Sequence, residues 1–299
     1  MNAAELLRTV RRIQIRTSHR VSEALAGQYH AVFRGQGIEF EEVRPYQVGD
    51  DVRLIDWNVS ARFGEPYIKL FREERELAVM LVVDLSESLL FGTREQSKRE
   101  LVTEMAATIA YSAVRNGDKV GLMIATDGAE RTILPRKGSR QILRVIRELL
   151  AFEPTRLRTN LAAALEELER VQRRRAVVFV ISDFIEPRED QRLEQVLRRL
   201  RRRHDLIPVV VGDPRERELP NVGLLELRDL ETGEMAVVDT GSRSVRRRFK
   251  ETADALAAQR VATLRRARTR AVELATGEDF VAALTRYFST RGRGEGRRA

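Results

Sequence analysis

One carboxylate and two hydroxyl side chains stand at alternate positions in the segment Asp84-Leu85-Ser86-Glu87-Ser88. Their oxygen atoms are hard ligands, which suit Mg²⁺, Mn²⁺ or Ca²⁺ better than zinc. One carboxylate and two neutral hydroxyls leave most of a divalent charge uncancelled, so a cation bound there would attract a further acidic group, including one on another protein. By itself the triplet is weak evidence, because Asp and Ser are also ordinary residues of the turn after a strand.

Two later segments supply another hydroxyl and a second carboxylate. Thr159 stands just before a helical pattern at 161–171, close to the position of a helix cap. Asp183 follows Ser182 at the end of the apolar run 176–181. The candidate ligands therefore come from three separate segments of the chain.

The neighbouring elements determine whether these side chains can meet. The apolar runs 77–83 and 176–181 are typical of strands that are buried on both faces of a parallel sheet. Ligands of such sheets bind just outside the carboxyl ends of the strands. Because the candidate ligands all fall at strand ends or helix starts, we expect them to converge on one edge of the sheet.

From residue 77 onward, strand patterns alternate with helix patterns. This alternation predicts an α/β fold, a doubly wound, mostly parallel sheet with helices on both faces. Strands are expected at 77–83, 119–125, 130–134, 176–181, 206–211 and 271–274, and helices at 94–116, 139–151, 161–172, 189–203, 245–268 and 278–288. The Asp127-Gly128 pair predicts a hairpin turn, and a second hairpin is expected between 224–227 and 235–238.

The five candidate ligands resemble the metal-ion-dependent adhesion site of von Willebrand factor type A domains; they are Asp84, Ser86, Ser88, Thr159 and Asp183. In that family an Asp-x-Ser-x-Ser motif, a Thr on a later loop and an Asp after a later strand surround one divalent ion, and a partner's carboxylate commonly completes its coordination. The resemblance implies a von Willebrand A-like fold and one bound Mg²⁺ (or Mn²⁺ or Ca²⁺). A structural interpretation stays open, in which the five residues are only caps and turns.

A second cluster of motifs lies upstream of the strand at 77–83. It reads Gly35-Gln-Gly37-Ile-Glu39-Phe40, Arg44-Pro45-Tyr46, Gly49-Asp50-Asp51-Val-Arg53-Leu-Ile55-Asp56-Trp57, Ser60-Ala61-Arg62 and Lys69. The string resembles the bacterial family known as domain of unknown function 58, and the resemblance covers roughly residues 30–290. It implies a frequent functional pairing with MoxR-type AAA+ ATPases, and most members have no assigned enzymatic activity.

Opposite charges alternate around the only tryptophan, Trp57, in a set made of Asp50, Asp51, Arg53, Asp56 and Arg62. At this density unpaired charges would repel one another or solvate poorly. We therefore expect mostly internal ion pairs with Trp57 packed beneath them, as part of a structural platform. Two alternatives stay open, a recognition surface for a partner and a catalytic cluster of carboxylates.

The sequence predicts a non-enzymatic, metal-dependent protein-binding module that works with a MoxR-type AAA+ ATPase in protein assembly or remodelling. Its client protein would offer an acidic residue to the metal. One alternative is a metal-dependent phosphatase or hydrolase with Asp84 as nucleophile. Haloacid-dehalogenase-like phosphatases also begin with such an Asp, but they need a second Asp two residues later as general acid, where this chain has Ser86.

The second alternative is nucleic-acid binding by the basic C-terminal segment. Residues 241–299 hold 15 Lys and Arg against 6 Asp and Glu, which equals the net charge of +9 of the whole chain. A basic segment suits a phosphate backbone. A solvated helix rich in Arg, which is a good helix former, explains the same composition without a nucleic-acid partner.

Composition limits the remaining classes. The chain has 299 residues, 42% of them hydrophobic, and no cysteine, which allows a sizeable core and excludes disulfide and thiolate chemistry. Isolated histidines make zinc unlikely, no phosphate-binding loop is present, and the apolar runs are too short to span a membrane. Without a signal peptide we expect a cytoplasmic protein.

The predicted parts are a helical segment at 1–30, a β-rich segment at 31–76, the α/β domain at 77–290 and a disordered tail at 291–299.

Overall fold

The computed structural model describes residues 37–74, 77–90, 92, 97–154, 159–185, 191–228 and 235–295. The chain divides into a small compact unit at residues 33–77 and a larger unit that contains the residues from Ala78 onward. The helical segment expected at 1–30 lies outside the described residues. The predicted limits of the four parts stay a prediction.

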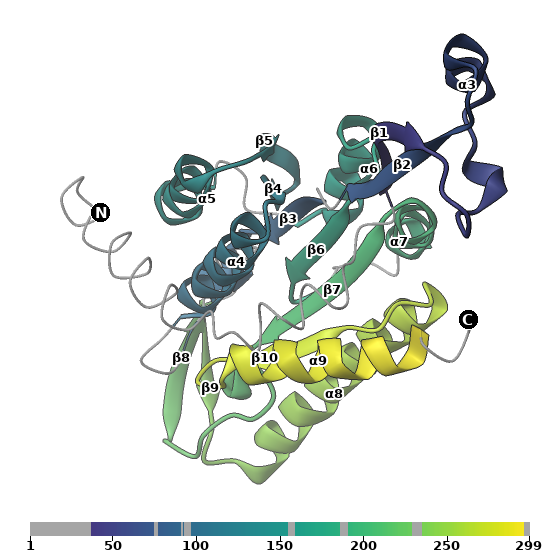
Figure 1. The fold of residues 1–299 in the computed structure, drawn as a ribbon. Coiled ribbons are helices and arrows are strands. Elements are labelled where there is room, and N and C mark those ends of the chain that lie inside the picture. The colour runs from purple at the N-terminus through teal and green to yellow at the C-terminus, as the bar shows by residue number, and fades with distance from the viewer. Residues whose placement is uncertain are drawn as a thin grey trace. The chain divides into compact units, whose positions relative to one another are not determined.

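The larger unit is built on a six-stranded sheet in the order β10-β7-β6-β3-β4-β5 (Figure 1). All neighbouring strands are parallel except β4 and β5, which form the antiparallel hairpin expected at Asp127-Gly128. The strands are β3 (Ala78–Asp84), β4 (Lys119–Thr126), β5 (Gly128–Arg136), β6 (Val177–Ser182), β7 (Asp205–Gly212) and β10 (Val272–Ala275). Because the chain winds away from β3 in both directions, the predicted fold class, a doubly wound and mostly parallel sheet with helices on both faces, is confirmed.

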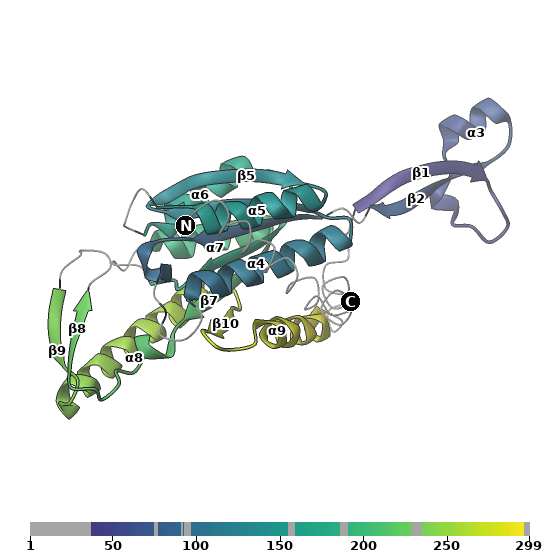
Figure 2. The same ribbon diagram turned by 90° about the vertical axis from the view of Figure 1, so that its left-hand side faces the viewer.

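Helices cover both faces of this sheet (Figures 1 and 2). Their bounds are α4 (Lys98–Arg115), α5 (Ser139–Ala151), α6 (Leu161–Val171), α7 (Gln191–Arg203), α8 (Arg243–Arg266) and α9 (Phe280–Glu295). Helix α9 ends at Glu295, beyond the end expected at Phe288. The described residues also contain three short 3-10 helices, η1 (Val52–Leu54), η2 (Glu87–Leu90) and η3 (Pro214–Glu216).

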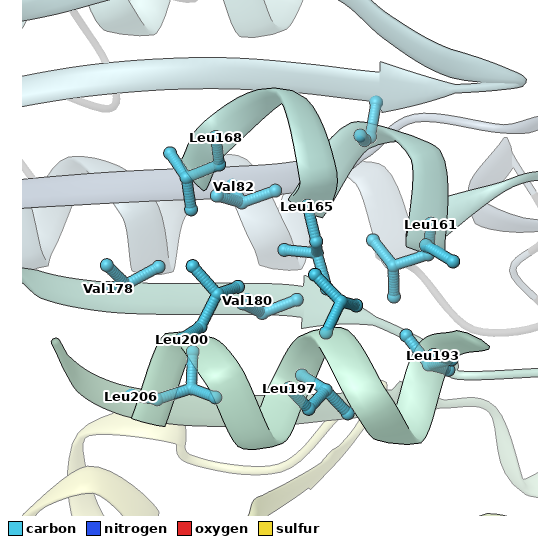
Figure 3. Packing of buried hydrophobic residues seen from close by; sticks show 14 of the residues in the cluster. Val82, Leu161, Leu165, Leu168, Val178, Val180, Leu193, Leu197, Leu200 and Leu206 are labelled. Carbon is cyan, nitrogen blue, oxygen red and sulfur yellow. The ribbon is translucent and has the colours of Figure 1, made fainter. Parts of the chain in front are cut away.

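The core between the sheet and helices α6 and α7 follows directly from the sequence pattern. Leucines recur at spacings of three and four in both helices, which places them on one face. Figure 3 shows this face against the valines of β3 and β6, with Val82, Val178 and Val180 beneath Leu165 and Leu197. Each fully buried side chain of this kind contributes about 1.5–3 kcal/mol, so this layer holds the ends of β3 and β6 in place.

The small unit is an antiparallel pair of strands, β1 (Gly37–Pro45) and β2 (Tyr67–Glu74), which the chain joins through η1 and α3 (Trp57–Phe63). Asp56 caps α3 by accepting hydrogen bonds from the backbone N–H groups of Asn58 and Val59, at 3.0 and 3.3 Å. Gly64 ends the helix in the left-handed conformation, with φ at 74°, which glycine adopts without steric cost.

A second hairpin, β8 (Leu224–Arg228) with β9 (Met235–Asp239), belongs to the larger unit and has the predicted antiparallel pairing. Within the described ranges, no helix combines the length and apolar character that crossing a membrane requires. The cytoplasmic location stays a prediction.

Candidate metal-binding site at the carboxyl edge of the sheet

Asp84 ends strand β3 and has no solvent-exposed surface. Each of its carboxylate oxygens accepts a hydrogen bond. Oδ1 accepts the backbone N–H of Ser86 at 3.0 Å, and Oδ2 accepts the hydroxyl of Ser182 at 2.7 Å. These two bonds fix the plane of the carboxylate at the point where β3 and β6 end, which is the edge that the sequence predicted.

The two hydroxyls of the motif lie beside each other. The Oγ atoms of Ser86 and Ser88 are 3.0 Å apart, with Ser86 buried and Ser88 half-buried. Ser86 stands directly before η2, and Ser88 lies within it. Two hydroxyl oxygens next to a buried carboxylate are a suitable partial shell for a hard cation.

Asp183 follows β6 and is 3% exposed. Its Oδ1 accepts the backbone N–H of Ile185 at 3.1 Å. Burial, followed by the negative charge of nearby Asp183, raises the pKa of Asp84 to about 6, while the hydrogen bonds from Ser182 and Ser86 oppose that rise. Two buried carboxylates that repel each other in this way form a place where an added cation would be stabilised.

Thr159 lies on the loop before α6, and it is half-buried. Its neighbour Asn160 donates its backbone N–H to the carbonyl of Thr126 at 2.7 Å, and Thr126 follows the residue of β4 that pairs with Asp84. Asn160, not Thr159, caps α6, since its side chain accepts the N–H of Ala163 at 3.0 Å. The hydroxyl of Thr159 is therefore not used as a helix cap.

The structure thus brings Asp84, Ser86, Ser88 and Asp183 together, and places Thr159 on a loop at the same edge of the sheet. Among the described residues no group of three or more His, Asp or Glu could hold a metal, so a cation here would depend on this mixed set of carboxylates and hydroxyls. The set fits Mg²⁺ or Mn²⁺, which accept oxygen ligands and keep several waters. Asp84 is wholly buried, and both of its carboxylate oxygens accept hydrogen bonds.

Two residues of this region were missed by the sequence reasoning. The hydroxyl of Ser182 also accepts the backbone N–H of Phe184 at 2.9 Å, and its position directly before Asp183 at a strand end could have revealed it. Lys98 is fully buried, with its Nζ 3.7 Å from Oδ2 of Asp183 and in an ion pair with Glu216. No local pattern indicates Lys98, because a cation in the first turn of a helix lies at the unfavourable end of its dipole.

A cavity of about 710 Å³ opens beside this edge, between α7 and α8. Phe184 and Ile185, which follow Asp183 directly, form part of its wall together with Leu193. Arg260 of α8 also lines it and donates a hydrogen bond from its guanidinium to the backbone carbonyl of Asp183 at 3.1 Å. The loop that carries Asp183 is therefore in contact with both the polar cluster and this cavity.

The charged string of the small unit forms ion pairs with residues outside it. Arg44 holds Asp50 through two hydrogen bonds of 2.8 Å, and Lys69 lies 3.3 Å from Asp56. Asp51 instead caps η1 by accepting the N–H of Arg53 at 2.9 Å. The expected pairing within the string is therefore replaced by pairing with the two strands of the unit.

The expectation that Trp57 packs beneath these charges is wrong for this unit. Trp57 is 72% exposed, because the short helix α3 buries Ser60 alone and leaves its first residue on the solvent side. Phe63, Val48 and Val52 are exposed as well. In this stretch of described chain, Arg53 and Arg62 are exposed and form no ion pair. This set of aromatic, apolar and basic side chains faces solvent.

Comparison with known proteins identifies the family to which the chain is similar. Residues 42–260 match the model of the family described as "Protein of unknown function DUF58". The uncharacterized protein Rv1480 of Mycobacterium tuberculosis is 35% identical over 294 residues, which cover 97% of this chain and 91% of that protein.

Solved structures with a similar arrangement include an aerotolerance-related membrane protein from Bacteroides fragilis, at 16% identity and a TM-score of 0.49, covering 73% of this chain and 99% of that one. A von Willebrand factor type A protein from Catenulispora acidiphila has 12% identity and a TM-score of 0.39, covering 76% of this chain and 43% of that one.

Proposed function

The chain belongs to the DUF58 family, and from that premise and the geometry of its polar edge we propose that it is a non-enzymatic, metal-dependent protein-binding module. The observation that carries the proposal is the buried Asp84 carboxylate, fixed by Ser182 and Ser86 and repelled by Asp183. A divalent cation at this place would relieve the repulsion and gain the hydroxyls of Ser86 and Ser88 as ligands. When bound, it supplies a positive charge to which a partner's carboxylate can bind.

The partner we propose is a client protein that offers an acidic residue to the metal. The chain would deliver or remodel this client together with a MoxR-type AAA+ ATPase. The ATPase partnership rests on the family resemblance of the sequence. The acidic contact rests on charge, because hydroxyl ligands leave part of a divalent charge uncancelled. The wall of the cavity beside Asp183 supports a protein partner, since Ile185, which is 36% exposed, offers apolar surface next to the polar edge.

A calorimetric titration with Mn²⁺ tests the metal site. We expect one site in the intact chain, and at least about tenfold weaker binding in Ser86→Ala, because a lost ligand or its support typically costs that much affinity. Asp84→Asn should bind still more weakly, since it removes a charge. Ser112→Ala is the matched control, because Ser112 is a buried hydroxyl of α4 that has no hydrogen-bond partner in the described part of the chain. Equal binding by all four proteins would refute the metal site.

Co-purification with the ATPase tests the partnership. Binding that falls in EDTA and in Asp183→Asn is expected if a partner's carboxylate completes the metal shell. Binding that ignores both changes would remove the metal from this interface and leave the partnership to another surface. The exposed face around Trp57 and Phe63 is then the surface to test first, with Trp57→Ala.

A further inference from the structure

Lys98 is among the largest fully buried side chains of the described residues, and it carries a charge. It occupies the first position of α4, where Ser97 and Glu100 form a reciprocal capping box that fixes the start of the helix. Burial of an ammonium group is costly unless ion pairs and hydrogen bonds offset the loss of hydration. The capped start of α4 therefore holds Lys98 at a place where its charge must be matched by its neighbours.

Two carboxylates provide that match. Nζ of Lys98 lies 3.7 Å from Oδ2 of Asp183 and forms a direct hydrogen bond with Oε1 of Glu216. Glu216 is fixed in turn, because its Oε2 accepts the backbone N–H of Asp213 at 2.8 Å. Asp213 accepts the hydroxyl of Thr276 at 2.6 Å. A polar network thus runs from the candidate metal site across the ends of β6, β7 and β10.

The charges of this network can be compared in the absence and presence of a metal. Asp84, Asp183, Glu216 and Asp213 can supply four negative charges. Lys98 and Arg260, whose guanidinium interacts with Asp183 and Glu216, supply two positive charges. Two negative charges are then in excess, and this excess favours the binding of a cation. Without Lys98, three would be in excess, and the Asp183 carboxylate would face Asp84 without the ammonium group that now lies 3.7 Å from it.

We propose that Lys98 is the internal counter-ion of the metal site and acts as a positioning residue. Its ammonium group stabilises the Asp183 carboxylate while the site is metal-free, and it lowers the affinity of the site for the metal. The proposal rests on the proposed function for the identity of the ligand, a divalent cation. Its physical basis is that a fixed positive charge beside a metal ligand repels the metal, and that the same charge removes the need for a permanently bound ion. Binding at such a site is readily reversible, which suits a module that engages and releases partners.

Three variants of the full chain change the excess charge stepwise. Lys98→Met keeps the length of the side chain and leaves three negative charges in excess. Glu216→Gln leaves one. The double variant Lys98→Met/Glu216→Gln leaves two, as in the natural chain, and is the matched control for the loss of the lysine itself.

Thermal unfolding in EDTA gives a readout that needs no metal. Lys98→Met is expected to unfold at a lower temperature than the natural chain, because Asp183 and Glu216 lose their counter-ion. The double variant is expected to recover part of that loss, since it removes one of the two uncompensated carboxylates. If neutralising Glu216 recovers nothing, Lys98 acts by packing alone and the counter-ion role is overturned.

Calorimetric titration with Mn²⁺ gives the second readout. The affinity for Mn²⁺ should increase with the excess negative charge. Lys98→Met should bind Mn²⁺ at least about tenfold more tightly than the natural chain. The double variant should bind about as tightly as the natural chain, and Glu216→Gln should bind more weakly. A merely structural role for Lys98 predicts the opposite, a weaker site in Lys98→Met, and that result would overturn the proposal. If the natural chain binds no Mn²⁺ while the EDTA series behaves as expected, the counter-ion role stands and the metal-dependent function fails.

Discussion

The hydroxyl of Ser182 serves two buried neighbours at once. It donates to Oδ2 of Asp84 and accepts from the backbone N–H of Phe184. Each of these groups would otherwise be unsatisfied in the interior, where the loss of a hydrogen-bond partner costs more than the bond itself contributes. The conformation of the candidate site therefore depends on a residue that the metal-site resemblance does not include.

Ser182→Ala should lower the free energy of unfolding by about 1–3 kcal/mol, because it leaves the Asp84 oxygen and the Phe184 N–H without this partner. Ser112→Ala should change it by less than about 1 kcal/mol, because the hydroxyl of Ser112 has no partner to lose among the described residues. Urea unfolding of both variants measures the difference. Equal losses in the two proteins would contradict the supporting role of Ser182.

Sequence reasoning reached Asp84, Ser86, Ser88 and Asp183 because each follows a strand that is apolar throughout, and parallel strands end at one edge. It could not reach Lys98 or Glu216, which come from α4 and η3 and meet only through tertiary packing. It also placed Trp57 beneath the charged string, because the density of those charges suggested that they pair with one another. A short helix that buries a single serine offers no interior for an indole.

At the scale of elements, strand β4 lies so close to β3 and β5 at Gly121 that no side chain fits there. A Cβ atom added at Gly121 would lie 2.7 Å from the sulfur of Met80 and 2.8 Å from the carbonyl oxygen of Ile133. The pairing of β4 with β5 is also irregular next to this residue. The strands expected at 119–125 and 130–134 are present, but this close approach has no signature in the apolar pattern.

Gly121→Ala should therefore destabilise the larger unit by about 1–3 kcal/mol or more, because backbone atoms of β5 must move to admit a methyl group. Gly212→Ala is the matched control, since a Cβ there meets its nearest neighbour, Oε2 of Glu216, at an ordinary 3.6 Å. Circular dichroism during thermal unfolding compares the two. A tolerated Gly121→Ala would show that β5 is free to shift.

The junction of α7 and β7 buries His204, which is 3% exposed and whose two ring nitrogens find no hydrogen-bond partner in the described part of the chain. Burial, and after it the positive charge of Arg203, lower the pKa of His204 to about 4, while Glu169 raises it and Arg175 lowers it further. The folded protein therefore resists the protonation that the unfolded chain accepts at about pH 6.5.

Because the pKa of His204 is lower in the folded protein than in the unfolded chain, this residue should lower the free energy of unfolding as the pH falls from about 6.5 towards 4. Below about pH 4 its contribution should not change further. At pH 5 the loss relative to pH 7 should be about 2 kcal/mol. Urea unfolding of the natural chain and of His204→Leu at both pH values isolates this contribution from that of the carboxyl groups. The same pH dependence in both proteins would contradict the assignment.

At the scale of the whole molecule, the division into two units gives each its own reporter. Trp57 is the only tryptophan and lies in the small unit, whereas most helices and strands belong to the larger one. Fluorescence therefore follows the small unit, and circular dichroism mainly follows the larger. The exposed indole should be quenched by iodide in the folded protein, and binding of a partner to this face should protect it.

The two reporters allow a sharp test of the charged string. Asp56→Ala removes the cap of α3 and the ion pair with Lys69, so it should destabilise the small unit by about 0.5–2 kcal/mol in unfolding followed by Trp57 fluorescence. Arg53→Ala should change it by less than about 0.5 kcal/mol, because Arg53 is exposed and its side chain has no acidic partner in the described chain. Neither change should move the transition seen by circular dichroism if the units unfold separately. If Arg53→Ala also abolishes ATPase binding while leaving stability intact, the string is a recognition surface. Equal destabilisation by both changes would restore the structural platform that the sequence predicted.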